Sequence, residues 1–336
     1  MSNTLLAIGA YDGRYANKTN ELCLLASQYA FTRNRIIIAA THFIKLIKVL
    51  GHESKVNLDL WEQTLIKPFE NDIVNHIDAL YNITDSSGYR MVSRCIEIEK
   101  KTNHDVAAII ELLKEKYDEH KIGPKEFKGY IHLGLTSQDL NTSANMMIMK
   151  DFREIWHLYQ SKMVNSLRLL NDDYTDNYML GFTHGQSATP TTFKWAFNIF
   201  IGRINNIMPL VHQHKLATKF GGATGGFNSL HSLALEIDWN EYGNKLCNEF
   251  GLIRNMYTSQ VDSYDSLLVL LSYLHIFNQI LYDMCQDIWH YVSRGVLCLK
   301  LVDDEVGSSA MPHKVNPIDF ENAMGNISIT NNFIQA

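Results

Sequence analysis

Long stretches of this chain place apolar residues at three- and four-residue steps, and this spacing constrains the fold more than any other feature. The stretches are residues 21–50, 139–171, 190–216 and 262–292. A 3.6-residue apolar period indicates a helix with one buried face, and the alternation typical of strands is rare in this sequence. Only six prolines are spread over the 336 residues. Helices of nearly 30 residues are much longer than the globular average, so the sequence predicts a bundle of long helices.

The composition argues against several classes of protein. Hydrophobic residues make up 46% of the chain, which is enough for a large core in two domains or in one elongated helical body. A formal net charge of −6 argues against a general nucleic-acid binder and against a protein of anionic membrane surfaces. An anionic ligand would therefore need a local positive site in an acidic body.

The cysteines and the N-terminal residues indicate a soluble cytoplasmic protein. The five cysteines are scattered and contain no C-x-x-C pair, so neither a disulfide framework nor a zinc site is expected. The first residues lack a basic region followed by an apolar core, so no secretory signal is predicted. The longest apolar runs, such as residues 266–277, are too short to span a membrane. We therefore expect no metal, no membrane and no nucleic acid among the partners.

Polar clusters lie at or just before the predicted helix starts. Thr102 and Asp105 have the spacing of a capping box, and residues 136–139 repeat it. A third cluster, residues 183–186, precedes Pro190, which is typical of a first helical position. Each helix start offers amide donors and the positive end of a dipole. A polyanion would be bound well where such ends meet, but the spacing does not decide whether they meet.

A fourth cluster is the stretch of residues 307–326, which reads GSSAMPHKVNPIDFENAMGN. Its first residues are small, and Asn316 and Pro317 suit the N-cap and the first position of a helix. Lys314 lies beside that helix start, and a helix N-terminus next to a lysine is a natural anion site. On residue types alone, a loop followed by a capped helix remains the alternative.

This stretch resembles the signature of the fumarase/aspartase superfamily, G-S-S-x-M-P-x-K-x-N-P, in the form found in adenylosuccinate lyases. His313 and the sequence Phe320-Glu321-Asn322 carry the closer resemblance. Further segments follow the family's order from about Asp12 to the last residue: 12–15 (D-G-R-Y), 102–105 (T-N-H-D), 136–139 (T-S-Q-D), 183–186 (T-H-G-Q), 221–228 and 259–260. On residue types alone, residues 12–15 would be a solvated turn and residues 102–105 a helix cap beside an incidental histidine. The glycine-rich segment, residues 221–228, would be a flexible loop.

The resemblance implies an all-α fold, a long-helix bundle of the fumarase/aspartase superfamily with a smaller N-terminal helical domain. It places the N-terminal domain at residues 1–125 and the central bundle at residues 126–336. The C-terminal domain that family members carry is expected to be absent from this sequence. The resemblance also implies a homotetramer with sites shared between subunits. This agrees with the geometry of a bundle, in which helix starts at opposite ends need neighbouring chains in order to meet.

The activity that the resemblance implies is β-elimination of fumarate from adenylosuccinate, leaving AMP, and from the succinylated aminoimidazole-carboxamide ribotide of purine nucleotide biosynthesis. Removing a proton beside a carboxylate forms a dianion, so the site needs positive charge and oriented donors. The family assigns the base to Ser308, with Lys314 assisting its deprotonation. His184 is then the acid that protonates the leaving nitrogen, and Glu321 orients it. This chemistry requires no metal and no redox cofactor.

The resemblance also assigns residues that hold the small-molecule nucleotide substrate. Arg14 and Tyr15 would contact the nucleotide, and His104 would bind the phosphate. The substrate carboxylates would be held by four polar residues, Thr136, Ser137, Gln260 and Asn316. The binding set is completed by Asn103, Asp105 and Thr183.

The sequence departs from the family's pattern at several positions. Gln138 stands in place of the commoner glutamate, Ser187 in place of proline, and Met324 in place of glutamate. Residues 261–265 differ from the usual I-E-P-H-D.

Two alternatives for the function stay open. One is another fumarate-releasing lyase of the superfamily, such as argininosuccinate lyase, against which His313 and the D-G-R-Y segment speak. The other is a truncated helical scaffold without activity.

Overall fold

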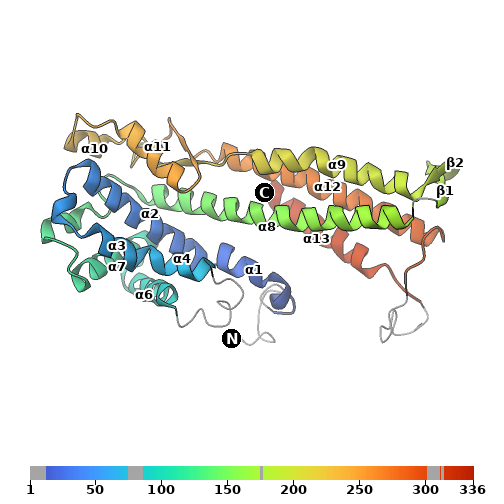
Figure 1. The fold of residues 1–336 in the computed structure, drawn as a ribbon, viewed down its shortest axis with the longest axis horizontal. Coiled ribbons are helices and arrows are strands. Elements are labelled where there is room, and N and C mark those ends of the chain that lie inside the picture. Colours follow the sequence, from blue (N-terminus) through green and yellow to red (C-terminus); the bar gives the residue numbers. More distant parts are fainter. Residues whose placement is uncertain (1–12, 75–85, 175–176, 301–310, 312–313) are drawn as a thin grey trace. The chain divides into compact units, whose positions relative to one another are not determined.

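The computed structural model of the protein describes residues 13–74, 86–174, 177–300, 311 and 314–336 (Figure 1). Helices account for most of these residues, so the predicted all-α fold is confirmed. The helices are α1 (Ala16–Ala26), α2 (Gln28–Val49), α3 (Leu58–Leu65), α4 (Lys67–Val74), α6 (Ser87–Thr102), α7 (Asp105–Glu119), α8 (Ser137–Asp173), α9 (Phe193–Gln213), α10 (Asn228–Leu233), α11 (Trp239–Glu249), α12 (Asp265–Ser293) and α13 (Ile318–Gln335). Short 3₁₀ helices span Glu53–Lys55 and Lys125–Tyr130. The strands are β1 (Tyr178–Thr183), β2 (Gln186–Thr192), β3 (Ala217–Lys219) and β4 (Ile253–Asn255).

The chain divides into two compact units that do not follow its order. Unit 1 contains the residues up to Phe152 together with Lys215–Tyr264. Unit 2 contains Arg153–His214 together with the residues from Asp265 onward. Helix α8 therefore contributes its first part to unit 1 and its second part to unit 2. The domain boundary between residues 125 and 126 stays a prediction.

Unit 1 is built around α2, which is buried along most of its length. Helices α1, α3, α6, α7 and α11 all pack on it. An aromatic cluster fills part of this core, where the ring centroid of Phe43 lies 4.7 Å from that of Trp61 and 6.0 Å from that of Tyr117. Burial of such large apolar side chains is the main force that holds these helices around α2. β3 and β4 add a short parallel pair, in which Thr218 lies opposite Arg254.

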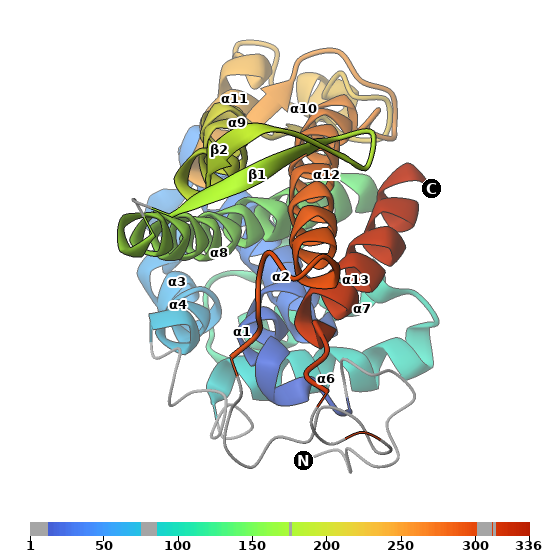
Figure 2. The same ribbon diagram turned by 90° about the vertical axis from the view of Figure 1, so that its right-hand side faces the viewer.

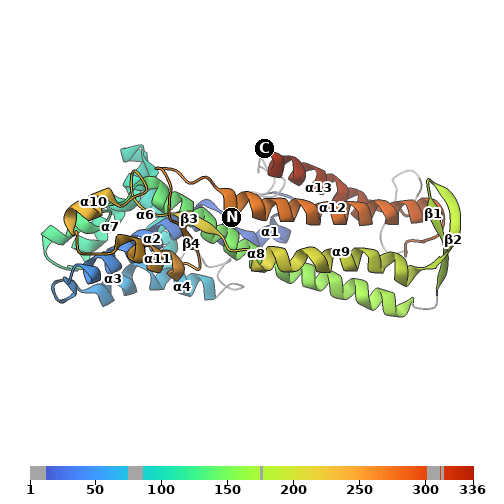
Figure 3. The same cartoon turned by 90° about the horizontal axis from the view of Figure 1, so that it is seen from above.

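Unit 2 is a bundle of α9, α12, α13 and the second part of α8 (Figure 3). Helix α12 packs on both α9 and α13. Trp156 of α8 meets Phe277 of α12 edge-on, with ring centroids 4.8 Å apart. Asn171 of α8 donates a hydrogen bond of 2.8 Å to Asn198 of α9. Three of the apolar-periodic stretches of the sequence supply α8, α9 and α12, as their spacing predicts, whereas α13 lies outside those stretches.

Helix α12 combines a buried stripe with a large exposed apolar surface. Among the described residues it is the one helix that is long and apolar enough to cross a membrane, with a mean hydropathy of 1.3 over its most apolar window. Only 28% of that window is buried within the chain. Polar residues interrupt the apolar runs of this helix, so no single run is long enough to cross a membrane, whereas the whole helical span is. Core helices of soluble bundles have the same length and composition.

The predicted helix start at Pro190 is wrong. This proline belongs to β2, which pairs with β1 in an antiparallel hairpin where Thr183 lies opposite Gln186 (Figure 2). Helix α9 begins later, at Phe193, and the side chain of Thr192 caps it. Proline suits a first helical turn but also an edge strand, and a two-stranded sheet consists of edges alone. The local signal was therefore ambiguous, and strand pairing decided it.

The capping box expected from Thr102 is also wrong. Thr102 is the last residue of α6, and Asn103 ends that helix in a left-handed conformation with φ of 52°. The N-cap of α7 is His104, whose Nδ1 accepts a hydrogen bond of 3.2 Å from Ala107 N. The turn between α6 and α7 thus uses the imidazole as the cap, a role for which histidine is not a preferred residue.

The two remaining helix starts lie close to their predicted positions. At the start of α8 one of the two bonds of the predicted box is present, because the carboxylate of Asp139 accepts a hydrogen bond of 2.7 Å from Thr136 N. Helix α13 begins at Ile318, so Pro317 takes the cap position that was expected for Asn316. A shift of one residue is within the usual uncertainty of a helix boundary.

Candidate functional site

A single buried carboxylate ties the first turn of α8 to the glycine-rich loop, residues 221–228. Asp139 has no exposed surface, and it accepts hydrogen bonds of 2.7 Å from Thr136 N and 2.8 Å from Gly221 N. Gly222 N lies 3.2 Å from the same carboxylate. The N-terminus of α8, with its free amide donors and positive dipole end, is therefore fixed against this loop.

Lys219 completes this arrangement. Its ammonium group donates hydrogen bonds of 2.6 Å to Asp139 Oδ1 and 2.5 Å to Gly222 O, and neither charged side chain is exposed. Burial lowers the pKa of Lys219, while the charge and the hydrogen bond of Asp139 act in the opposite direction. A buried ion pair holds its geometry only when its other hydrogen-bonding groups also find partners. Backbone groups of the loop supply those partners here.

The glycine-rich loop also contacts the segment that carries Gln260. Gly225 has a φ of +81°, and an added Cβ there would lie 2.1 Å from Thr258 O, so only glycine allows this approach. Gln260 follows two residues after this contact and is exposed. The start of α8 and the segment of Gln260 therefore pack on the same loop of unit 1.

A second buried charge joins the start of α7 to α8. Arg35 of α2 is 2% exposed, and its guanidinium group pairs with Asp105 and donates a hydrogen bond of 3.2 Å to Asn141 Oδ1 of α8. Burial acts to raise the pKa of Asp105, but the hydrogen bonds from Arg35 and Val106 N outweigh it, and the pKa is lowered. His104 precedes Asp105 and is exposed. An anionic carboxylate is thus held beside an accessible imidazole.

Arg14 and Tyr15 lie immediately before α1. The guanidinium carbon of Arg14 is 5.9 Å from the centroid of the Tyr15 ring, and the Arg14 side chain is exposed. Among the described residues, no hydrogen bond or ion pair joins either side chain to the start of α7 or of α8. Their proposed contact with the nucleotide therefore stays a prediction.

In unit 2, His184 occupies the tip of the β1–β2 hairpin. His184 and Gly185 have φ angles of 53° and 75°, the two positive values that a type I′ turn requires. The imidazole is exposed. The guanidinium carbon of Arg294 lies 4.4 Å from the centroid of the Phe182 ring, and its Nη2 lies 3.5 Å from the position of a Cβ on Gly185. Arg294 therefore braces the tip that presents His184.

Glu321 lies in the first turn of α13, where it accepts a hydrogen bond of 3.0 Å from Trp289 Nε1 of α12. Within the described part of a single chain, no hydrogen bond joins Glu321 to His184. The side chain of Lys314, just before this helix, is exposed. Ser308, the predicted base, lies outside the described residues.

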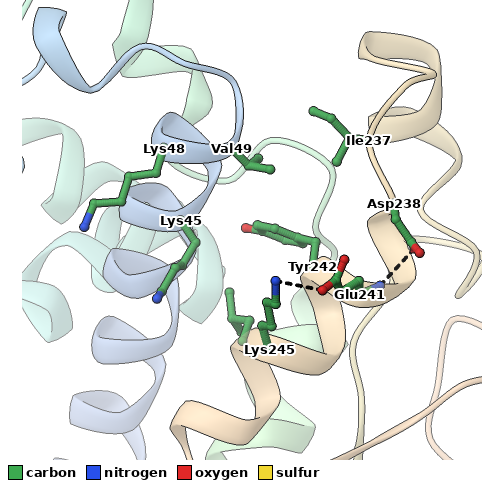
Figure 4. Close-up of a pocket in the computed structure, with 9 residues that line it drawn as sticks. Lys45, Lys48, Val49, Ile237, Asp238, Glu241, Tyr242 and Lys245 are labelled. Atoms are coloured by element: carbon green, nitrogen blue, oxygen red, sulfur yellow. Dashed lines mark hydrogen bonds and ion pairs between the residues drawn. The ribbon is translucent and has the colours of Figure 1, made fainter.

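A pocket of about 480 Å³ opens between the end of α2 and α11 in unit 1 (Figure 4). Lys45 at its edge pairs with Glu249, and Lys245 pairs with Glu241 at 2.8 Å. None of the residues predicted for the site lines this pocket. We therefore place the candidate site at the helix starts and not in this pocket.

Comparison with known proteins gives a consistent result. A family model described as lyase matches residues 13–329. The adenylosuccinate lyase of Legionella pneumophila (strain Corby) is 34% identical over 328 residues, which cover 97% of this chain and 69% of that protein. The chain belongs to the adenylosuccinate lyase family. The Dictyostelium discoideum member is 36% identical over 337 residues (98% of this chain, 69% of that protein), and the Escherichia coli (strain K12) member 30% over 338 residues (99% and 70%).

A solved structure supports the fold of this adenylosuccinate lyase family member. The 3-carboxy-cis,cis-muconate lactonizing enzyme from Pseudomonas putida superimposes with a TM-score of 0.65 at 18% identity. The match covers 90% of this chain and 63% of that chain, so this chain spans less than two thirds of its neighbour's length. At this identity the comparison supports the helical architecture alone.

The structure groups some of the residues that the adenylosuccinate lyase motifs predict. Thr136, Ser137 and Gln260 lie on segments that share the glycine-rich loop, and His104 and Asp105 are linked to α8 through Arg35. Asn103, in the turn before α7, and Thr183, at the end of β1, are exposed, and Asn316 is half-buried before α13. The individual roles of all these residues stay predictions.

Sequence reasoning missed several residues that hold the adenylosuccinate lyase motifs in place. Asp139 was noted only as a cap, and Lys219, Arg35, Arg294 and Trp289 were not named. Arg35 carries a usable signal, because it is a charged residue inside an apolar-periodic stretch. For Lys219 the only signal is its place next to the glycine-rich loop.

Proposed function

We propose that this chain carries the fumarate-releasing activity of the adenylosuccinate lyase family. The reaction is β-elimination from adenylosuccinate, which yields AMP and fumarate, and from the succinylated aminoimidazole-carboxamide ribotide of purine nucleotide biosynthesis. The observation that carries the proposal is the family match over nearly the whole chain, which includes the residues around the start of α8. The chain spans about 70% of the length of these relatives.

The start of α8 suits the succinyl carboxylates of such a substrate. Thr136 and Ser137 place hydroxyl donors at a helix N-terminus, where the dipole and the free amides favour an anion. Gln260 adds an amide donor from the segment that packs against the glycine-rich loop at Gly225. Asn316, before the start of α13, is proposed to hold a carboxylate in the same way.

The proton transfers are assigned to residues of unit 2. Ser308 removes the proton beside the carboxylate, and Lys314 supplies the positive charge that favours the alkoxide and the dianion. His184 protonates the leaving nitrogen, and Glu321 keeps that imidazole oriented and basic. The exposed position of His184 on a braced hairpin tip supports this role, because the imidazole is free to meet a substrate.

The nucleotide part of the substrate is assigned to residues that precede two helices. His104 binds the phosphate at the start of α7, where its Nε2 is left free because Nδ1 caps the helix. Arg14 and Tyr15 bind the nucleotide through the guanidinium group and the ring. The chemistry requires neither a metal ion nor a redox cofactor, and the proposed location of the protein is the cytoplasm.

The proposed assembly is a homotetramer in which neighbouring chains complete each site. Unit 2 leaves large apolar side chains exposed, including Phe333 at 78%, Trp195 at 69% and Leu169 at 68%. A monomer rarely exposes so much apolar surface, whereas a bundle that packs on its copies buries it. A site shared between chains also accounts for the lack of a hydrogen bond between His184 and Glu321 of one chain.

The test is fumarate release by the full-length protein. Adenylosuccinate and argininosuccinate are supplied in parallel, and product formation is followed by absorbance and confirmed by chromatography of AMP or arginine. We expect release from adenylosuccinate alone. Release from argininosuccinate would favour the other lyase, and no release from either substrate would favour a scaffold without activity.

A further inference from the structure

We propose that Asp139 and Lys219 are positioning residues of this site. Their buried ion pair sets the distance between the first turn of α8 and the glycine-rich loop. The inference rests on the proposed function, because the groups that it positions are the proposed carboxylate-binding side chains. Both residues are fully buried, so neither touches the substrate, and they act through the segments that they join.

The partners of the pair belong to the segments that border the site. Asp139 accepts from Thr136 N at the start of α8 and from Gly221 N and Gly222 N of the loop. Lys219 returns a hydrogen bond of 2.5 Å to Gly222 O. The ion pair therefore holds the loop backbone through its amide groups and through the carbonyl group of Gly222. A change in the pair would move both the loop and the start of α8.

A second buried contact fixes the same two elements farther from the site. The hydroxyl groups of Ser143 in α8 and Thr218 in β3 lie 2.9 Å apart, and both residues are completely buried. Thr218 directly precedes Lys219 in the chain. With two polar contacts about one helical turn apart, α8 cannot slide along β3 without breaking one of them.

The position of the pair argues for a geometric role beyond stability. A buried ion pair is often no more stable than apolar side chains of the same volume, because removing both charges from water is costly. It does impose one arrangement, since each charge requires its partners at fixed distances. Here that arrangement sets where the hydroxyl groups of Thr136 and Ser137 stand relative to the loop, as substrate recognition needs.

The first measurement uses the unmodified full-length protein. Hydrogen exchange at single-residue resolution should show slow exchange at the amides of Gly221 and Gly222, which donate to Asp139. The amides of Ala223 and Thr224 donate to no group within the described residues and should exchange fast. Fast exchange at Gly221 and Gly222 would overturn the proposal without any variant.

The second measurement uses Lys219→Met, which keeps the volume of the side chain and removes its charge. We expect faster exchange at Gly221 and Gly222, and a loss in kcat/KM of about 100-fold, the cost of a misplacement near 1 Å. Affinity for fumarate should fall, whereas affinity for AMP, which lacks the succinyl carboxylates, should not change. Where this variant does not fold, Lys219→Met combined with Asp139→Asn removes both charges and leaves neither unpaired.

The matched control is Lys150→Met. Lys150 is a lysine of unit 1 whose side chain is only partly buried, and it donates a hydrogen bond of 2.9 Å to Phe250 O, away from the glycine-rich loop. It should lower thermal stability without changing the affinity for fumarate. Equal losses in the two variants would show a structural effect and overturn the positioning role, as would faster exchange with an unchanged kcat/KM. If the unmodified protein releases no fumarate, the proposed function fails, while the exchange data still decide whether the pair holds the loop.

Discussion

Trp289 Nε1 and Glu321 Oε1 are joined by a hydrogen bond of 3.0 Å, which links α12 to the first turn of α13. The carboxylate is therefore oriented by a contact within its own chain. In the proposed mechanism this carboxylate holds His184. The indole of Trp289 then acts on the proposed acid, His184, indirectly through Glu321.

Replacing Trp289 by Phe should lower kcat by about 10- to 100-fold, because a hydrogen bond to a charged group contributes about 1.5–3 kcal/mol and 1.4 kcal/mol corresponds to tenfold in rate. Steady-state kinetics of the full-length protein measures this. Trp195→Phe is the control, since Trp195 is 69% exposed on α9 and its indole makes no hydrogen bond within the described residues. Similar losses in the two variants would contradict a specific link through Glu321.

Replacing Ser308 by Ala should abolish elimination and leave substrate affinity nearly intact, because its proton transfer occurs only during the reaction. A general base typically contributes 10²–10⁴-fold, on the order of the expected loss in turnover. Turnover and calorimetric binding are measured on the full-length protein. Ser309→Ala is measured in parallel. If turnover is lost in Ser309→Ala and kept in Ser308→Ala, the base is Ser309 and the assignment is wrong.

Mixing the inactive variants His184→Ala and Ser308→Ala should restore activity. If the two residues of one site come from different chains, random reassembly gives some sites both intact residues, up to about a quarter of the wild-type activity. Native mass spectrometry confirms that subunits have exchanged. Exchange without recovery would mean that one chain supplies both residues.

Stability should fall as the pH is lowered, because His42 is buried as a neutral imidazole. Tyr242 donates to its Nδ1 at 2.7 Å, its Nε2 lies 3.0 Å from Leu133 O, and burial lowers its pKa from 6.5 to about 3. The neutral form is favoured in the folded state, so its contribution is complete above pH 6.5 and is lost between pH 6.5 and 3. The free energy of unfolding should drop by up to about 1.4 kcal/mol per pH unit in this window.

Urea unfolding at pH 7.5 and pH 5 measures this dependence. His132, whose pKa is lowered to about 4 by burial, should add to it. The comparison variant is His42→Gln, which should be less stable at pH 7.5 but should lose less stability on going to pH 5. An identical pH dependence in the variant and the wild type would show that His42 does not titrate on unfolding.

Replacing Gly222 by Ala should destabilise the protein by about 1–3 kcal/mol, the usual range for a residue forced into a sparsely populated backbone region. Its φ is +78°, and an added Cβ would lie 2.5 Å from Gly134 O, a backbone atom that cannot move aside easily. Gly129→Ala is the matched control, because nothing lies within 4 Å of a Cβ at that position. Thermal unfolding compares the two, and equal melting temperatures would contradict the close approach of the loop.

Features that depend on neighbouring residues could be predicted from the sequence. The contact between Asp139 and Thr136 at the start of α8 could be predicted because the two residues are three positions apart, which is the spacing of a capping box. The long rods were found because apolar periodicity persists over many turns. Family motifs then supplied the identity of the chain, which spacing alone does not contain.

Features that depend on distant pairing could not be predicted. Lys219 and Asp139 are 80 positions apart, and nothing near either residue indicates the other. Pro190 was misassigned because its own preferences fit both a helix start and an edge strand, and pairing with β1 decided between them. The capping box predicted at Thr102 was wrong for a similar reason. Asn103 ends α6 in a left-handed turn, and His104, one residue before Asp105, is the N-cap of α7.

The interleaved order of the two units has a consequence for cotranslational folding. The chain leaves unit 1 after Phe152, returns at Lys215 and completes the unit only at Tyr264. At a synthesis rate of about 5–20 residues per second, the first segment waits roughly ten seconds for the second to emerge from the ribosome. During that interval Asp139 has no ammonium partner, and the face of α2 that receives α11 stays uncovered. The nascent chain therefore passes through a stage in which a chaperone that shields apolar helices would raise the yield of folded protein.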